Sequence, residues 1–171
     1  SILMYSIIAI IVLVFFSAYF SATETAFTSL NRIRMKNMAN DGNQKAREVM
    51  ELSENYDNLL STILVGNNIV NIALSSISTV LFISIYPRYG ATLATVFATV
   101  VVLIFGEISP KSLAKENPEK FAMISASFIK FLSVLLKPIN WLFAQWKKLL
   151  AKLFNANEAR PITEDELLTM V

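Results

Sequence analysis

The chain has 171 residues, of which 54% are hydrophobic and only 16% are charged, and its formal net charge is +2. Soluble domains carry about 25% charged residues, so this composition argues against an ordinary soluble protein. The sequence has no Cys and no His, which excludes disulfides, thiolate and imidazole metal sites and Ser-His-Asp catalysis. We therefore expect no enzymatic activity.

Three long stretches carry no charged residue: residues 1–23, 58–87 and 89–106. A helix needs about 20 apolar residues to cross the hydrocarbon core, and it satisfies the backbone groups that hydrocarbon cannot. The stretches therefore predict three transmembrane helices, over residues 1–30, 59–86 and 91–109. The first stretch has no basic residue before its apolar run, which favours a retained span over a cleaved signal peptide.

The segments between the spans contain turn signals and basic residues. Asp41-Gly42-Asn43 predicts a turn, and residues 46–60 predict a short amphipathic helix. Residues 86–90 (YPRYG) predict a tight turn between the second and third spans, with its tyrosines at the depth of the membrane interface. Lys and Arg concentrate after the first and third spans, so the positive-inside bias places both segments and the C-terminus in the cytoplasm and the N-terminus outside.

Residues 118–154 allow two interpretations. Their apolar run is long enough for a fourth crossing, but Lys130 would then lie near mid-bilayer at a cost of about 2.5–3.5 kcal/mol. Pro138, Trp141 and Trp146 among several lysines favour helices in the cytoplasmic interface, with snorkelling lysines and tryptophans at headgroup level. Residues 1–154 are thus predicted to form one transmembrane domain with juxtamembrane helices.

Residues 155–171 predict a linker and the start of a further helix. Thr163 and Glu166 form a capping box after Pro161. The sequence therefore predicts that a cytoplasmic region follows.

Polar side chains recur inside the predicted spans, where each of them is costly. Ser17, Ser21 and Glu24 share one helical face by their spacing, and Asn67 and Asn71 lie one turn apart in the second span. Structural alternatives exist: hydroxyls often bond their own helix, Asn can join helices, and Glu24 can pair with interfacial Lys or Arg. We expect only a structural role for the hydroxyls of Thr25, Thr28, Ser75 and Ser78.

The third span ends in residues 105–111 (FGEISPK). Pro110 has no N–H, so in an α-helix it leaves the carbonyl of Gly106 without its donor. That carbonyl lies beside Glu107, for which we predict a site role, whereas Lys111 is expected at the level of the lipid phosphates. Hydroxyl, amide, carbonyl and carboxylate oxygens suit a hard cation such as Mg²⁺, Ca²⁺ or Na⁺ rather than Zn²⁺ or Cu⁺.

Three segments, residues 20–27 (FSATETAF), 66–71 (GNNIVN) and 105–111, resemble in order and content the transmembrane domain of the cyclin M/CorC family of magnesium transporters. The resemblance implies an all-α integral membrane fold, with three transmembrane helices and amphipathic juxtamembrane helices on the cytoplasmic side. It also implies a homodimer surrounded by lipid in the plasma membrane, and a cytoplasmic pair of CBS modules after the C-terminal residues.

The same resemblance implies a transported Mg²⁺ that is bound, largely without water, among the three segments. Carried onto this sequence, the implied ligands are the Ser17 and Ser21 hydroxyls, the Asn67 and Asn71 amide oxygens, the Gly106 carbonyl and the Glu107 carboxylate. Na⁺ is the implied coupling ion, and no nucleic acid is expected as a partner.

Three functional hypotheses follow. The leading one is Mg²⁺ export by a Na⁺-coupled transporter that exposes its site alternately to each side. The second is a channel, and the third is a regulatory membrane scaffold or Mg²⁺ sensor without transport.

Overall fold

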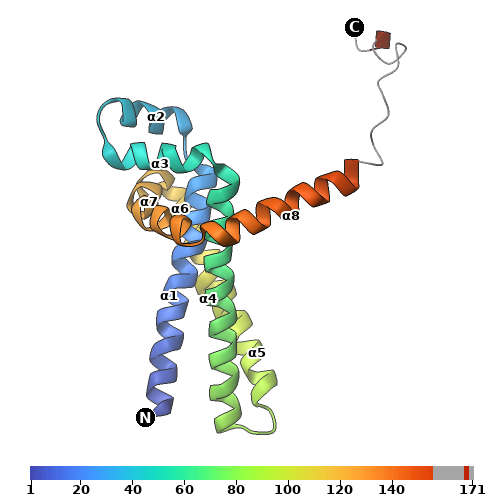
Figure 1. Ribbon diagram of the computed structural model, residues 1–171. Coiled ribbons are helices and arrows are strands. Elements are labelled where there is room, and N and C mark those ends of the chain that lie inside the picture. Colours follow the sequence, from blue (N-terminus) through green and yellow to red (C-terminus); the bar gives the residue numbers. More distant parts are fainter. Residues whose placement is uncertain (156–167, 170–171) are drawn as a thin grey trace. The chain divides into compact units, whose positions relative to one another are not determined.

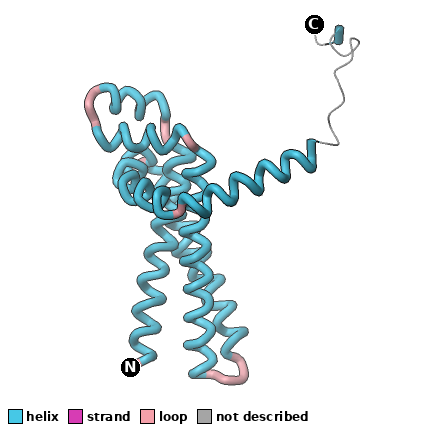
Figure 2. Tube along the Cα trace, in the orientation of Figure 1, coloured by secondary structure: helices cyan, strands magenta, loops and turns pink. Residues whose placement is uncertain are grey.

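The computed structural model describes residues 1–155 and 168–169, and within these residues it is helical without any strand (Figure 1, Figure 2). The elements in chain order are α1 (Ile2–Ser29), α2 (Arg32–Asn40), α3 (Gln44–Glu54), α4 (Tyr56–Ile85), α5 (Gly90–Val101), the π-helix η1 (Val102–Ile108), α6 (Ser109–Glu116), α7 (Pro118–Leu135) and α8 (Lys137–Asn155). The chain divides into two compact units, Ser1–Leu135 and Leu136–Val171. The predicted all-α class is confirmed for the described residues.

Three helices of the first unit are long and apolar enough to cross a membrane: Ile2–Ser29, Tyr56–Ile85 and the continuous helix Gly90–Glu116. They coincide with the three predicted spans. The third is longer than predicted because α5, η1 and α6 follow one another without a break. Pro110 lies in the first turn of α6 and, because α6 continues from η1, in the interior of the third span.

An asparagine caps the N-terminus of each of the helices α2, α3 and α4. Asn31, Asn43 and Asn55 each precede a helix, and each side chain accepts a hydrogen bond from the backbone N–H three residues later. The prediction of one helix over residues 46–60 is therefore wrong, because Asn55 ends α3 and caps α4. Gly42 adopts φ +99°, which confirms the predicted turn, whereas α2 was not predicted.

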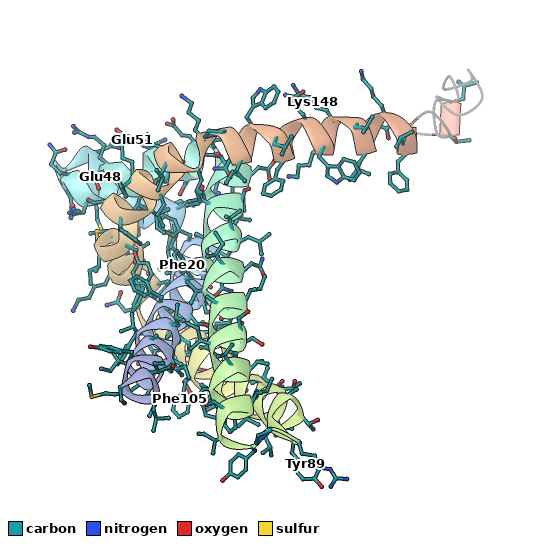
Figure 3. The ribbon with its side chains drawn as sticks, turned by 60° about the horizontal axis from the view of Figure 1, so that its bottom comes forward. Phe20, Glu48, Glu51, Tyr89, Phe105 and Lys148 are labelled. Atoms are coloured by element: carbon teal, nitrogen blue, oxygen red, sulfur yellow. The ribbon has the colours of Figure 1, made fainter. Side chains whose placement is uncertain are left out.

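The spans α4 and α5 form an antiparallel hairpin (Figure 1). Its turn carries Tyr89 at the tip, as Figure 3 shows. Gly90 allows the two helices to approach closely, since a Cβ at this position would lie 2.5 Å from the Cα of Ile83. The tight turn predicted over residues 86–90 is confirmed.

Small side chains let the helices of the first unit pack closely. Ala22 and Ala26 of α1 are buried together with Ala114 of α6 and with Ala122 and Ala126 of α7. Residues of this size allow the close backbone approach that is common between membrane helices. Their packing holds α1 against α6 and α7, and α1 also packs against α4, so the polar faces of the spans meet.

Large apolar side chains cover the outer surface of the spans. Phe15 of α1, Ile72 of α4 and Val96 of α5 are all more than half exposed in the isolated chain. An apolar exterior of this kind suits contact with lipid rather than water.

The helices α7 and α8 leave the number of crossings at three or four. A break at Leu136 separates them, and together they are apolar enough to form one broken span or a re-entrant loop. Lys130 of α7 pairs with Glu51 of α3 at 3.4 Å between Nζ and Oε2. The interfacial placement of residues 118–154 stays a prediction, and the predicted capping box at Thr163 lies outside the described residues.

Candidate functional site

Ser17 and Ser21 bring two hydroxyls to the interior of the first unit. Both side chains are fully buried, and the spacing of four residues places them one above the other on α1. Ser17 Oγ donates a hydrogen bond of 2.6 Å to Asn71 Oδ1 on α4. Ser21 Oγ donates a longer bond, 3.4 Å, to Glu107 Oε1 on η1. One face of α1 therefore contacts polar groups of both other spans.

The amide of Asn71 is oriented from both ends. Its oxygen accepts from Ser17, and its Nδ2 donates to Asn67 Oδ1 at 3.4 Å, one turn earlier on α4. The amide oxygen has two lone pairs, so it retains one for a cation while it accepts from the hydroxyl. Ser17 donates its hydroxyl proton in this bond, so the lone pairs of its Oγ also remain available to a cation.

Gly106 brings the backbone of η1 against α1. The residue is buried, and a Cβ at this position would lie 2.5 Å from Ser17 Oγ. Only glycine permits this approach without displacement of the serine. The next residue, Glu107, adds the carboxylate, so hydroxyl, amide, backbone and carboxylate groups from three spans meet within one region.

The π-helix at this point was not predicted from the sequence. Its hydrogen bonds run to the residue five positions earlier, as in the bond from the Ser109 N–H to the Ile104 carbonyl. In this register the missing N–H of Pro110 concerns the carbonyl of Phe105, whereas in α-helical register it concerns that of Gly106. The one missing N–H thus leaves one of these two adjacent carbonyls without a donor from residue 110, and the register decides which. The ligand role of Gly106 stays a prediction.

Lys111 pairs with the carboxylate of the candidate site. Its Nζ lies 3.0 Å from Glu107 Oε2, one helical turn earlier, with side chains that are 40% and 28% exposed. The i,i+4 spacing of an acid and a lysine was the signal in the sequence that predicts such a pair. The position of this ammonium at the level of the lipid phosphates stays a prediction, whereas its pairing with Glu107 was not predicted.

Two further polar residues of α1, Thr28 and Glu24, have different surroundings. Thr28 Oγ1 donates to the Glu24 carbonyl at 3.0 Å, which is the structural role expected of this hydroxyl. Glu24 itself is half-buried, follows Ser21 by three residues, and interacts electrostatically with Lys111. Glu24 therefore lies on the same face of α1 as the candidate ligand Ser21.

The donor chemistry of the site fits a hard cation. Within residues 1–155 and 168–169, no three His, Cys, Asp or Glu side chains lie where they could hold a metal ion together. The groups that do meet are hydroxyl, amide and carboxylate oxygens close to helix backbone, and oxygen donors of these types are those that Mg²⁺, Ca²⁺ and Na⁺ prefer. Asn67 joins this group through its hydrogen bond from Asn71.

Comparison with known proteins gives matches over almost the whole chain. The family model described as the cyclin M transmembrane N-terminal domain matches residues 7–171. A relative from Escherichia coli (strain K12), the UPF0053 inner membrane protein YfjD, is 37% identical over 159 residues, which cover 91% of this chain and 37% of the relative. A UPF0053 protein from Haemophilus influenzae is 35% identical over 167 residues, which cover 96% of this chain and 40% of the relative.

A more distant relative carries a functional name. The Haemophilus influenzae protein named Polyamine export protein is 24% identical over 184 residues, which cover 99% of this chain and 43% of the relative. The chain thus spans about two fifths of the length of the relatives described.

Proposed function

The chain belongs to the cyclin M transmembrane N-terminal domain family, and on this basis we propose that it carries Mg²⁺ across the membrane as a secondary transporter. The observation that supports the proposal best is the meeting of oxygen groups from three spans, with Ser17 against Asn71 and Ser21 against Glu107. A site that lies between helices, rather than within one, changes its exposure when the helices move against each other.

The single carboxylate sets the strength of the proposed binding. Mg²⁺ demands nearly ideal octahedral geometry and dehydrates reluctantly, so few charged ligands make its release practicable. Glu107 supplies one negative charge, and the neutral oxygens of Ser17, Ser21 and Asn71 supply dipoles. This composition favours reversible binding, which a transporter requires.

Further parts of the proposal rest on the family resemblance of the three motifs. They are export rather than uptake, coupling to Na⁺, and alternate exposure of the site to the two sides. The proposed assembly is a homodimer in the plasma membrane, with the N-terminus outside and a cytoplasmic CBS pair. Mg²⁺ is the cargo in this scheme, and the surrounding lipid is the other partner.

Measurement of Mg²⁺ efflux from loaded liposomes tests the proposal. We expect Glu107→Ala and Asn71→Ala each to reduce efflux by at least about 100-fold, because even indirect partners of metal ligands contribute about 10–100-fold. Glu116→Ala is the matched control, since this acid lies on the same span and is exposed. Unchanged efflux from the Glu107→Ala variant would overturn the assignment.

The same preparation separates the alternative functions. Efflux that saturates with Mg²⁺ and depends on a Na⁺ gradient argues against a channel. A scaffold without transport predicts no efflux and no Mg²⁺-dependent rise in melting temperature. It also predicts a weaker dimer after Asn67→Ala, because the asparagine would then hold helices together.

A polyamine is the second candidate cargo. Glu107 pairs with the primary ammonium of Lys111, so this carboxylate accepts the same chemical group that polyamines carry. One relative is named Polyamine export protein. Efflux of spermidine without efflux of Mg²⁺ from the same liposomes would favour this cargo, whereas Mg²⁺ transport that excess spermidine leaves unchanged would exclude it.

A further inference from the structure

Lys111 presents a cation to the carboxylate that is proposed to bind the cargo. The helix continues through Pro110, so residues 107 and 111 lie one turn apart on the same side. Lys111 Nζ lies 3.0 Å from Glu107 Oε2, while Glu107 Oε1 accepts from Ser21. Both carboxylate oxygens therefore have partners before any cargo arrives.

This pairing solves an electrostatic problem of an empty carrier. An unpaired carboxylate within a membrane is costly, and a transporter that returns without cargo has to move that carboxylate through its cycle. An ammonium on the same helix compensates the charge, and because it is covalently attached it does not have to be recruited from solution. The same ammonium competes with the cargo, because cargo binds only to the fraction of molecules in which Glu107 is free.

A second acid lies on the face of α1 that carries Ser21. Glu24 follows Ser21 by three residues on α1, and its charge also acts on Lys111, though less strongly than that of Glu107. The lysine thus lies under the influence of two carboxylates from two different helices. When a cation takes Glu107, the ammonium has a neighbouring partner and is not left unpaired beside an added positive charge.

We propose that Lys111 is a tethered counter-ion of the transport site, which neutralises Glu107 in the empty protein and passes to Glu24 when the cargo binds. This inference rests on the proposed function. It assigns Lys111 and Glu24 as positioning residues, since neither is required to touch the cargo.

Removal of the ammonium separates binding from transport. Without its competitor, Glu107 binds cargo more tightly, but the empty carrier returns with an uncompensated charge. Net transport therefore falls, whereas exchange of Mg²⁺ for Mg²⁺ continues, because every crossing is then made with cargo bound. An ion pair that served only stability predicts lower melting temperature with unchanged or weaker binding.

Calorimetric titration of Mg²⁺ into the protein in lipid nanodiscs tests the binding step. We expect Lys111→Met to bind Mg²⁺ about tenfold more tightly, as if a tenth of the wild-type molecules had Glu107 free. Lys111→Arg keeps the charge and should bind like wild type. Lys115→Met is the matched control, an exposed lysine one turn further along α6. Equal tightening in Lys111→Met and Lys115→Met, or none in either, overturns the inference.

The part of Glu24 requires a double variant. Glu24→Gln should weaken Mg²⁺ binding in the wild-type background, because the displaced ammonium loses its second partner. In the Lys111→Met background the same change should have no effect. A loss of similar size in both backgrounds would identify Glu24 as a direct ligand and contradict the proposed exchange.

Transport by liposomes that contain the same variants completes the test. Lys111→Met should lose net Mg²⁺ efflux at least about tenfold, yet retain tracer exchange with Mg²⁺ on both sides. Parallel loss of both activities would contradict the inference while wild-type transport still supports the proposed function. If the wild-type protein neither binds nor moves Mg²⁺, the proposed function fails and this inference fails with it.

Discussion

Ser17 joins three spans through one hydroxyl. Its proton is committed to Asn71 Oδ1 on α4, and its oxygen lies against the backbone of Gly106 on η1. Any group added at residue 106 has to push this oxygen away, and rotation of the serine breaks the bond to Asn71. The site is therefore sensitive to volume at a position that contributes no side chain of its own.

Gly106→Ala should disable the site at a modest cost in stability. The new Cβ would lie 2.5 Å from Ser17 Oγ, so the hydroxyl has to turn away from Asn71. We expect the free energy of unfolding to fall by about 1–3 kcal/mol, the usual range for an overpacked interior. Mg²⁺ binding should fall by at least about tenfold, the lower end of the loss found when a metal-site partner is removed. Thermal unfolding and Mg²⁺ titration measure the two effects.

The double variant Ser17→Ala/Gly106→Ala separates the steric effect from the chemical one. Removal of Oγ leaves Ser17 Cβ 3.4 Å from the new group, which is an ordinary contact. Stability should then recover most of the loss, whereas Mg²⁺ binding should not, because the hydroxyl is gone. Recovery of binding together with stability would show that Ser17 is not a ligand.

The sequence and its family resemblance were sufficient to propose candidate ligands but not to predict the contacts between them. The spacing of Ser17, Ser21 and Glu24 follows from helical geometry alone, so their common face was predictable. The bond from Ser17 to Asn71 depends on how far α1 and α4 are shifted along each other, and no local pattern contains that shift. The pairing of Lys111 with Glu107 was missed because a lysine near a span end is usually interpreted as a lipid anchor.

At the scale of helices, η1 determines which groups the third span presents. Seven residues of π-helix, Val102–Ile108, widen the helix directly before Pro110. Wide turns of this kind are rare and often mark functional sites, because their backbone bonding is weaker than in an α-helix. Here the wide turn contains both Gly106 and Glu107. The weaker backbone hydrogen bonds of η1 leave backbone carbonyl oxygens more accessible there than in a regular α-helix.

Pro110→Ala should strengthen this helix and weaken the site. The alanine supplies the N–H that the carbonyl of Gly106 accepts in α-helical register, which favours regular α-helix over η1. We expect the melting temperature to stay the same or to rise, since Pro costs about 3 kcal/mol more than Ala within a helix. Mg²⁺ affinity should fall by about tenfold, as for loss of an indirect partner.

Pro118→Ala is the control for this comparison. Pro118 begins α7, where proline is well tolerated, and it lies outside the site. Its replacement should leave Mg²⁺ binding unchanged. If Pro110→Ala keeps full affinity, the carbonyl freed by Pro110 contributes nothing to the cargo site.

Element boundaries were less predictable than element types. The three spans were evident because their uncharged length leaves few alternatives. The division between α3 and α4 was missed because an asparagine cap within a polar segment resembles the rest of that segment. The π-helix was missed for a different reason: proline and glycine predict a weakened helix, and tertiary packing of Gly106 against Ser17 selects the register that results.

At the scale of the whole molecule, the number of crossings decides where the lysine-rich helix α8 lies. Three crossings keep the segment after α1 and the segment after α6 on one side of the membrane, in agreement with their shared excess of Lys and Arg. A fourth crossing through α7 and α8 would place the end of α8 on the opposite side. Lys130 pairs with Glu51. A fourth crossing would place the charge of Lys130 in the bilayer, and either Glu51 would enter with it or the ion pair would break.

The absence of cysteine from the sequence makes this question directly testable by single-cysteine labelling in intact cells. Tyr89→Cys, at the exposed tip of the α4–α5 hairpin, should react with a membrane-impermeant maleimide from outside. Lys36→Cys and Lys148→Cys should react only after permeabilisation, because three crossings place both on the cytoplasmic side. The cysteine-free parent gives the background. Labelling of Lys148→Cys from outside, with Lys36→Cys still protected, would require a fourth crossing, because one further passage through the bilayer separates the two positions in that topology.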